Sequence, residues 1–98
     1  MPTDTSAPAK SMVTVMLPAA LVRLFPGSVP QVELTASTVG ELIDALDSRW
    51  RGMRHCVCDS TPAIRRHINI FVDGRRASLR TRLAPGADVI VLTAMSGG

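Results

Sequence analysis

A chain of 98 residues, 46% hydrophobic and 19% charged, has the size of one small domain and the balance of an ordinary globular protein. Its apolar runs are too short to span a membrane, and its first ten residues lack the apolar stretch of a secretory signal. We therefore expect a cytoplasmic protein with no membrane partner. The net charge is +3, and arginine supplies ten of the eleven positive side chains, Lys10 being the other.

The arginines cluster at residues 49–54, 65–66 and 75–82. Such clusters can contact phosphate or an acidic protein face, although a solvated surface is the simpler interpretation. Nucleic-acid binding usually adds aromatic side chains on which bases stack, and aromatic residues make up only 3% of this chain. The composition therefore predicts no nucleic-acid partner.

The only two cysteines lie in the stretch "HCVC", at Cys56 and Cys58. A structural zinc site needs about four ligands, normally from two separated pairs. The chain has no second cysteine pair, and His67 is its only histidine besides His55. We predict no metal site, and we expect one or both thiols to be small buried hydrophobic groups near the end of a helix.

Two strands are expected in the first third of the chain, after a flexible leader at residues 1–11. The first strand is "MVTVML", which Pro18 stops, and the second is "QVELTA", in which Val32 and Leu34 share one face. The loop between them carries a Pro26-Gly27 turn signal. Three apolar residues of this loop are expected to lie beneath the sheet: Leu21, Leu24 and Phe25.

The segment "STVGELIDALDSRW" predicts an amphipathic helix. Thr38 and Glu41 form a capping box, in which the hydroxyl and the carboxylate accept hydrogen bonds from backbone N–H groups that the start of a helix leaves free. Apolar residues then recur at helical spacing and form a single stripe: Val39, Leu42, Ile43, Leu46 and Trp50. We expect the helix to end near residues 50–52.

The second half of the chain begins with a linker that has room for a short helical turn. We then expect a strand "INIFV", a tight Asp73-Gly74 turn with a short return strand, and a last strand "ADVIVLTA". Leu79 and Leu83 are expected to be buried points on the connection between these strands. The order of elements predicts an α+β domain over residues 12–94, in which one main helix covers one face of a mixed sheet of four to five strands. Residues 95–98 form a tail.

The last strand is apolar on both sides, although a sheet covered by one helix has an open face on which polar residues are expected. Val89 and Val91 point one way, while Ile90, Leu92 and Ala94 point the other. The surplus side chains predict an exposed apolar patch, which is typical of a partner surface. The residues expected to dock a partner are Phe71, Ile90, Leu92 and Met95. The alternative is that the leader or the loop after the first strand covers this face.

The chain ends in "MSGG". Glycines at the tip carry no Cβ, so a cleft as thin as a backbone can admit them. Four extended residues reach roughly 13 Å. This length allows a terminal carboxylate to enter a partner's cleft while the domain docks outside.

Three stretches together resemble the ubiquitin-like β-grasp sulfur carriers of the MoaD/ThiS/CysO family. They are "TVGELIDAL" on the helix, "HINIFVDGR" on the third strand, and "LAPGADVIVLTAMSGG" at the end. The resemblance covers about residues 12–98 and implies the β-grasp fold. The linker "MRHCVCDSTPAIRRH" is most similar to that of the CysO-type branch.

The resemblance implies a carrier, with catalysis in its partner enzymes. Gly98 would carry the carboxylate that a MoeB/ThiF-like enzyme adenylates with ATP and that then becomes a thiocarboxylate, while Ser96 and Gly97 form the arm. A synthase or sulfhydrylase would accept the sulfur, and the CysO-like linker favours synthesis of cysteine or homocysteine. No bound cofactor is implied. The alternatives are a modifier that joins Gly98 to lysines, the small subunit of a molybdopterin-synthase-like complex, and an interaction module with an idle tail.

Overall fold

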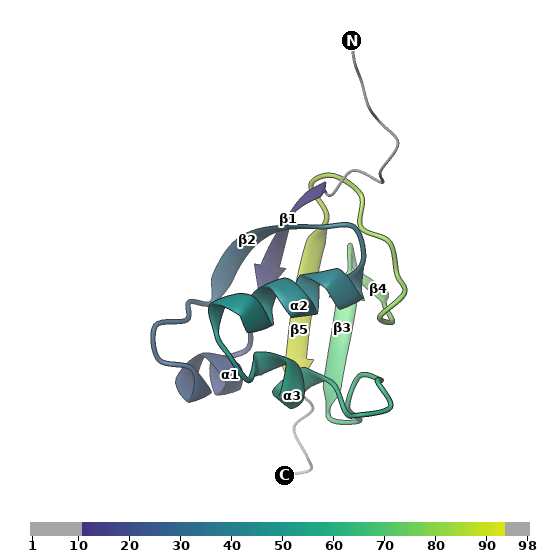
Figure 1. Ribbon diagram of the computed structural model, residues 1–98. Helices are drawn as coiled ribbons and strands as arrows, with labels where there is room; N and C mark the ends of the chain where they lie inside the picture. The colour runs from purple at the N-terminus through teal and green to yellow at the C-terminus, as the bar shows by residue number, and fades with distance from the viewer. Residues whose placement is uncertain (1–10, 94–98) are drawn as a thin grey trace.

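The computed structural model describes residues 11–93 (Figure 1). The elements, in chain order, are β1 (Ser11–Met16), α1 (Ala19–Leu24), β2 (Gln31–Ala36), α2 (Val39–Arg49), α3 (Met53–Val57), β3 (Ile68–Val72), β4 (Arg75–Arg76) and β5 (Asp88–Thr93).

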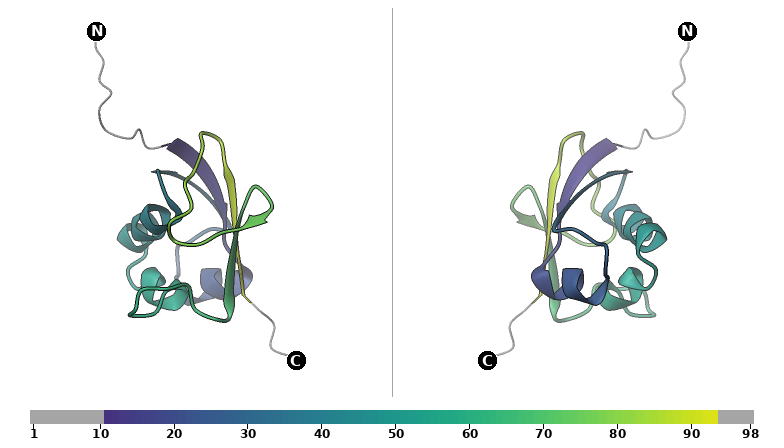
Figure 2. Two further views of the ribbon diagram at one scale, coloured as in Figure 1. Left: turned by 90° about the vertical axis from the view of Figure 1, so that its right-hand side faces the viewer. Right: turned by 90° about the vertical axis from the view of Figure 1, so that its left-hand side faces the viewer.

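The five strands form one sheet in the order β2-β1-β5-β3-β4. β1 pairs with β5 in parallel, and the other neighbours are antiparallel. The helices α2 and α3 lie on the same side of this sheet, while α1 sits at its lower end (Figure 2). The predicted mixed sheet with one main helix on one face is confirmed, and the helical layer leaves the opposite face open.

The core lies between the sheet and α2. Alternate strand residues point into it, among them Val15, Ile70 and Val89, each no more than 1% exposed. The predicted stripe of α2 meets them, because Val39, Leu42, Ile43 and Leu46 are all buried and Trp50 packs at the margin. Each such aliphatic side chain contributes about 1.5–3 kcal/mol when fully buried.

The start of α2 is closed by its cap and by a distant loop. Thr38 Oγ1 accepts a hydrogen bond from Glu41 N at 3.2 Å, as the capping box predicts. The Glu41 carboxylate reaches one residue further than expected, because it accepts from the backbone N–H of Ser37. Gly40 N donates to Leu79 O at 2.9 Å, and a Cβ on Gly40 would lie 3.3 Å from that oxygen. The glycine therefore permits the loop to lie directly against the helix.

Asp47 joins α2 to α3. Its carboxylate accepts hydrogen bonds from the backbone N–H groups of Gly52 and Arg54, each at 3.0 Å. These bonds, above all the one from Arg54, lower the pKa of Asp47. The predicted end of α2 and the short helical turn after it are both confirmed.

The hairpin between β3 and β4 has the predicted tight turn. Asp73 and Gly74 both have positive φ values, of 50° and 85°. This combination matches the primed turns whose twist suits two-residue hairpins. β4 pairs with only the last two residues of β3, Phe71 and Val72.

Three expectations for this part of the fold were wrong. Ser11, assigned to the leader, already belongs to β1 and pairs with Ala36. The segment after β1 contains the helix α1, which begins when Pro18 O accepts from the N–H groups of Leu21 and Val22. Leu24, the last residue of this short helix, is 64% exposed, whereas Leu21 one turn earlier is buried.

Three further apolar positions outside the strands and helices were expected to be buried. Leu83 is buried as predicted, whereas Leu79 and Phe25 are only partly buried at the edge of the core.

Candidate functional site

The open face of the sheet carries an apolar patch in the middle of its strands. Met16 on β1 lies beside Ile90 on β5, and Ile90 lies opposite Phe71 on β3. Leu92 follows two residues along β5 on the same face, since alternate residues of a strand share a face. Met16, Ile90 and Leu92 are 39%, 38% and 45% exposed, while Phe71 is half-buried. We call these four residues the open-face patch.

No described element covers this patch. α1 packs at the end of the sheet, and the exposed fractions of Ile90 and Leu92 remain high in its presence (Figure 2). The alternative in which the loop after β1 covers this face is therefore wrong. The other suggested cover, residues 1–10, lies outside the described residues.

Charges divide the open face into two parts. Towards the start of β5, Asp88 lies beside Thr14, whose neighbour on β2 is Glu33. At the β4 edge, Arg76 donates a hydrogen bond to Asn69 Oδ1, which holds the guanidinium next to the patch. The apolar part lies towards the end of β5, the end from which the tail continues.

A groove of about 410 Å³ lies at this end of β5. Thr93 lines it together with apolar side chains of α1 and the β3 start, including Leu21, Leu24 and Ile68. Arg65 and His67 are its basic members. We call it the exit groove, because the chain leaves the described domain beside it.

The residues predicted to form the arm lie outside the described residues. These are Met95, Ser96, Gly97 and Gly98, as well as Ala94 at the end of the predicted last strand. Of the four predicted docking residues, the structure describes Phe71, Ile90 and Leu92, and it brings all three together on the open face.

Cys58 lies in the core margin at 2% exposure, and burial raises the pKa of its thiol. It therefore remains a protonated, poorly nucleophilic group, as expected of a buried hydrophobic thiol. Cys56 is partly buried and lines the exit groove. Among residues 11–93, no three His, Cys, Asp or Glu side chains are grouped closely enough to hold a metal ion.

Sequence reasoning missed Met16 and the exit groove. The signal for Met16 was present in "MVTVM", where Met12, Thr14 and Met16 alternate with two buried valines. The exit groove depends on α1, which was not predicted, so its lining had no signal in the sequence.

Within the described part of the chain, no helix is long and apolar enough to cross a membrane. The profile of the ThiS family matches residues 15–98, which include the whole open-face patch and the tail. The chain belongs to the ThiS family. Its five-stranded sheet and main helix are the β-grasp fold of the ubiquitin-like sulfur carriers and modifiers.

Solved structures agree with this membership. The matching chain in the crystal structure of the Amycolatopsis orientalis BexX/CysO complex is 29% identical, with a TM-score of 0.78 over 88% of this chain and 99% of that chain. Mycobacterium tuberculosis CysO is 27% identical, with a TM-score of 0.76 over 85% of this chain and 99% of that one. SAMP1 from Haloferax volcanii is 26% identical, with a TM-score of 0.76 over 90% of this chain and 100% of that chain. A search of curated proteins found no match.

Proposed function

We propose that this ThiS-family chain is a sulfur carrier whose terminal Gly98 carboxylate is adenylated and then converted to a thiocarboxylate. The observation that carries the proposal is the open-face patch at the end of β5 from which the tail continues. Five residues follow Thr93, so an arm in extended conformation would reach roughly 17 Å beyond the sheet. A partner docked on the patch can therefore receive the tip in its own active site.

The chemistry needs no catalytic group in this chain. A Gly98 carboxylate oxygen attacks the α-phosphorus of ATP in a MoeB/ThiF-like enzyme, and pyrophosphate leaves. Sulfide then attacks the acyl carbon and displaces AMP, which leaves a thiocarboxylate at Gly98. The terminal thiocarboxylate formed in this way can be carried from the adenylating enzyme to a synthase or sulfhydrylase.

We favour amino-acid sulfur transfer as the destination, of the cysteine or homocysteine type. The similarity to two CysO chains supports this choice. The linker at residues 53–67 supports it as well, since it carries Val57 and Cys58 as buried apolar groups.

The test is intact mass spectrometry after incubation with a purified MoeB/ThiF-like enzyme, MgATP and sulfide. We expect the mass gain of one sulfur in place of one oxygen, located at Gly98 by fragmentation. A variant lacking Gly97 and Gly98 should show no gain, and Ser96→Ala, which keeps the tip, should react. Absence of both the adenylate and the thiocarboxylate with a competent enzyme would contradict the proposal.

The second candidate is a protein modifier, which the similarity to SAMP1, a small archaeal modifier protein, favours. It predicts adducts between Gly98 and target lysines that survive treatment with thiol and base. Lys10 is the only lysine of the chain, so lysine-linked polymers would require it. Lys10→Arg should abolish any such polymer and leave thiocarboxylate formation unchanged.

A further inference from the structure

A second surface, at the β4 edge of the sheet, has no part in the proposed carrier chemistry. β4 covers only two residues of β3, and beyond it two adjoining hollows border the strand. They have volumes of about 370 Å³ and 260 Å³ and share Ile64 and Ala77. We call this continuous depression the edge groove.

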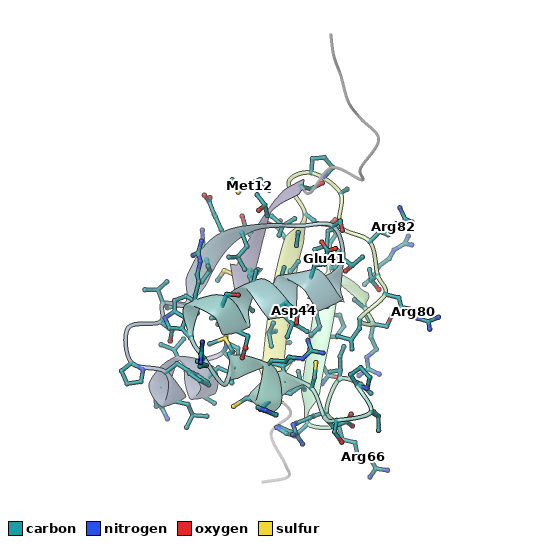
Figure 3. The ribbon with its side chains drawn as sticks, in the orientation of Figure 1. Met12, Glu41, Asp44, Arg66, Arg80 and Arg82 are labelled. Atoms are coloured by element: carbon teal, nitrogen blue, oxygen red, sulfur yellow. The ribbon has the colours of Figure 1, made fainter. Side chains whose placement is uncertain are left out.

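The edge groove is apolar in the middle and basic at both ends. Most of its apolar residues line the larger hollow: Pro62, Ala63, Ile64, Ala77 and Leu79. Arg80 stands at one end. Arg65, Arg66 and Arg76 stand at the other. Figure 3 shows Arg66 and Arg80 pointing outward from separate loops on this side of the molecule. No acidic side chain lines either hollow among the described residues.

Both walls of the groove are fixed by local hydrogen bonds. In one wall, Asp59 Oδ1 accepts from Thr61 N at 2.9 Å and from Ala63 N at 3.0 Å, so this carboxylate is engaged within its own loop. In the other wall, Ser78 N donates to Thr81 Oγ1 at 2.9 Å. A groove held in shape before binding loses little conformational freedom when a ligand enters.

Two of the arginines at the end opposite Arg80 are held in place as well. Arg65 Nε donates to His55 O at 2.7 Å, and Arg76 donates to Asn69 Oδ1. Arg65 uses its Nε in this bond, so its two terminal nitrogens keep donors for a carboxylate. Guanidinium groups bind carboxylates through paired donors, and they cost less to desolvate than an ammonium group.

We propose that the edge groove binds an extended acidic segment of a partner protein, with an aliphatic side chain seated between the two basic ends. The charge pattern selects this occupant, because carboxylates can meet Arg80 at one end and Arg66 at the other. A nucleic acid fits less well, since no aromatic side chain lines the groove and its middle is apolar. The surface is distinct from the open-face patch and does not depend on Gly98.

The probe is a fluorescein-labelled, end-blocked peptide, Asp-Glu-Val-Leu-Asp-Glu, titrated against the full chain at low salt. We expect saturable anisotropy, and amide shift changes in ¹⁵N-labelled protein confined to residues 63–66, 69 and 76–80. Replacing Val-Leu by Gly-Gly should weaken binding roughly tenfold, since the apolar contact is lost. A single-stranded oligonucleotide of equal charge should bind less tightly than the peptide.

Charge reversal tests the two ends. The double variant Arg66→Glu and Arg80→Glu should lose at least roughly tenfold in affinity. The matched variant Arg23→Glu and Arg51→Glu changes the net charge equally at exposed positions elsewhere and should bind as the parent does. Equal losses in the two double variants, shift changes spread over residues 23 and 49–51, or tighter binding of the oligonucleotide would overturn the proposal. Unchanged amide spectra outside the substituted loops verify folding.

Discussion

The two faces of the sheet use the same strands for different purposes. On β5, Val89 and Val91 are at most 1% exposed beneath α2, while Ile90 is 38% and Leu92 is 45% exposed on the other side. Both sets are β-branched or aliphatic, so composition does not distinguish them. The covered set stabilises the domain by burial, whereas the open set gains little from folding. Their apolar character is therefore better explained by docking than by stability.

The largest effect should follow from a change on the covered face. Leu46→Ala removes a side chain that is 1% exposed and leaves a cavity between α2 and the sheet. We expect a loss of about 2–5 kcal/mol in the free energy of unfolding, measured by urea denaturation. Leu92→Ala makes the same chemical change on the open face and should cost only about 0.5 kcal/mol. Similar losses in the two variants would erase the distinction between the faces.

A smaller effect, on function, should follow from a charge on the open face. Ile90→Glu places a carboxylate in the middle of the open-face patch, where a docked adenylating enzyme would have to desolvate it. We expect kcat/KM for adenylation to fall at least roughly tenfold, a change of about 1.4 kcal/mol, with little change in the urea midpoint. Thr35→Glu, an exposed position on β2, is the matched control and should keep its activity. Full activity of Ile90→Glu would remove the patch from the docking surface.

The smallest effect should come from acid, and it concerns the helical layer alone. Hydrogen bonds to the carboxylate, chiefly from the Arg54 backbone, hold the pKa of Asp47 below its ordinary value of 3.8. This contribution to stability is therefore complete above about pH 4 and is lost as the pH falls through the lowered pKa. The thermal midpoint of Asp47→Asn should accordingly approach that of the parent below pH 4. A constant difference between them down to pH 2 would show that the carboxylate charge is not responsible.

Much of the fold was predictable because its signals are local. The capping box at Thr38, the alternation in β2 and the Asp73-Gly74 turn each specify their element within a few residues. The patch was predictable too, since the alternation in β5 left Ile90 and Leu92 without a covering layer.

The missed features depend on contacts between distant segments. α1 has only six residues and buries one side chain, Leu21, so the helical spacing of Leu21, Leu24 and Phe25 covers too short a stretch to distinguish a helix from a loop. Leu24 could not be placed without knowing where the helix lies against the sheet. The edge groove likewise arises from two loops far apart in the sequence, which meet at Ile64 and Ala77.

The parallel pairing of β1 with β5 has a consequence for how the protein is made. β5 lies between β1 and β3, so without it the strands would fall into two separate hairpins, β1-β2 and β3-β4. The sheet therefore closes only after synthesis has passed Thr93, because its central contacts join the two ends of the chain. A chain that stops before β5 lacks the central strand, with Val89 and Val91 of the core and Ile90 and Leu92 of the open-face patch. A chain truncated in this way therefore cannot present the complete patch on a closed sheet.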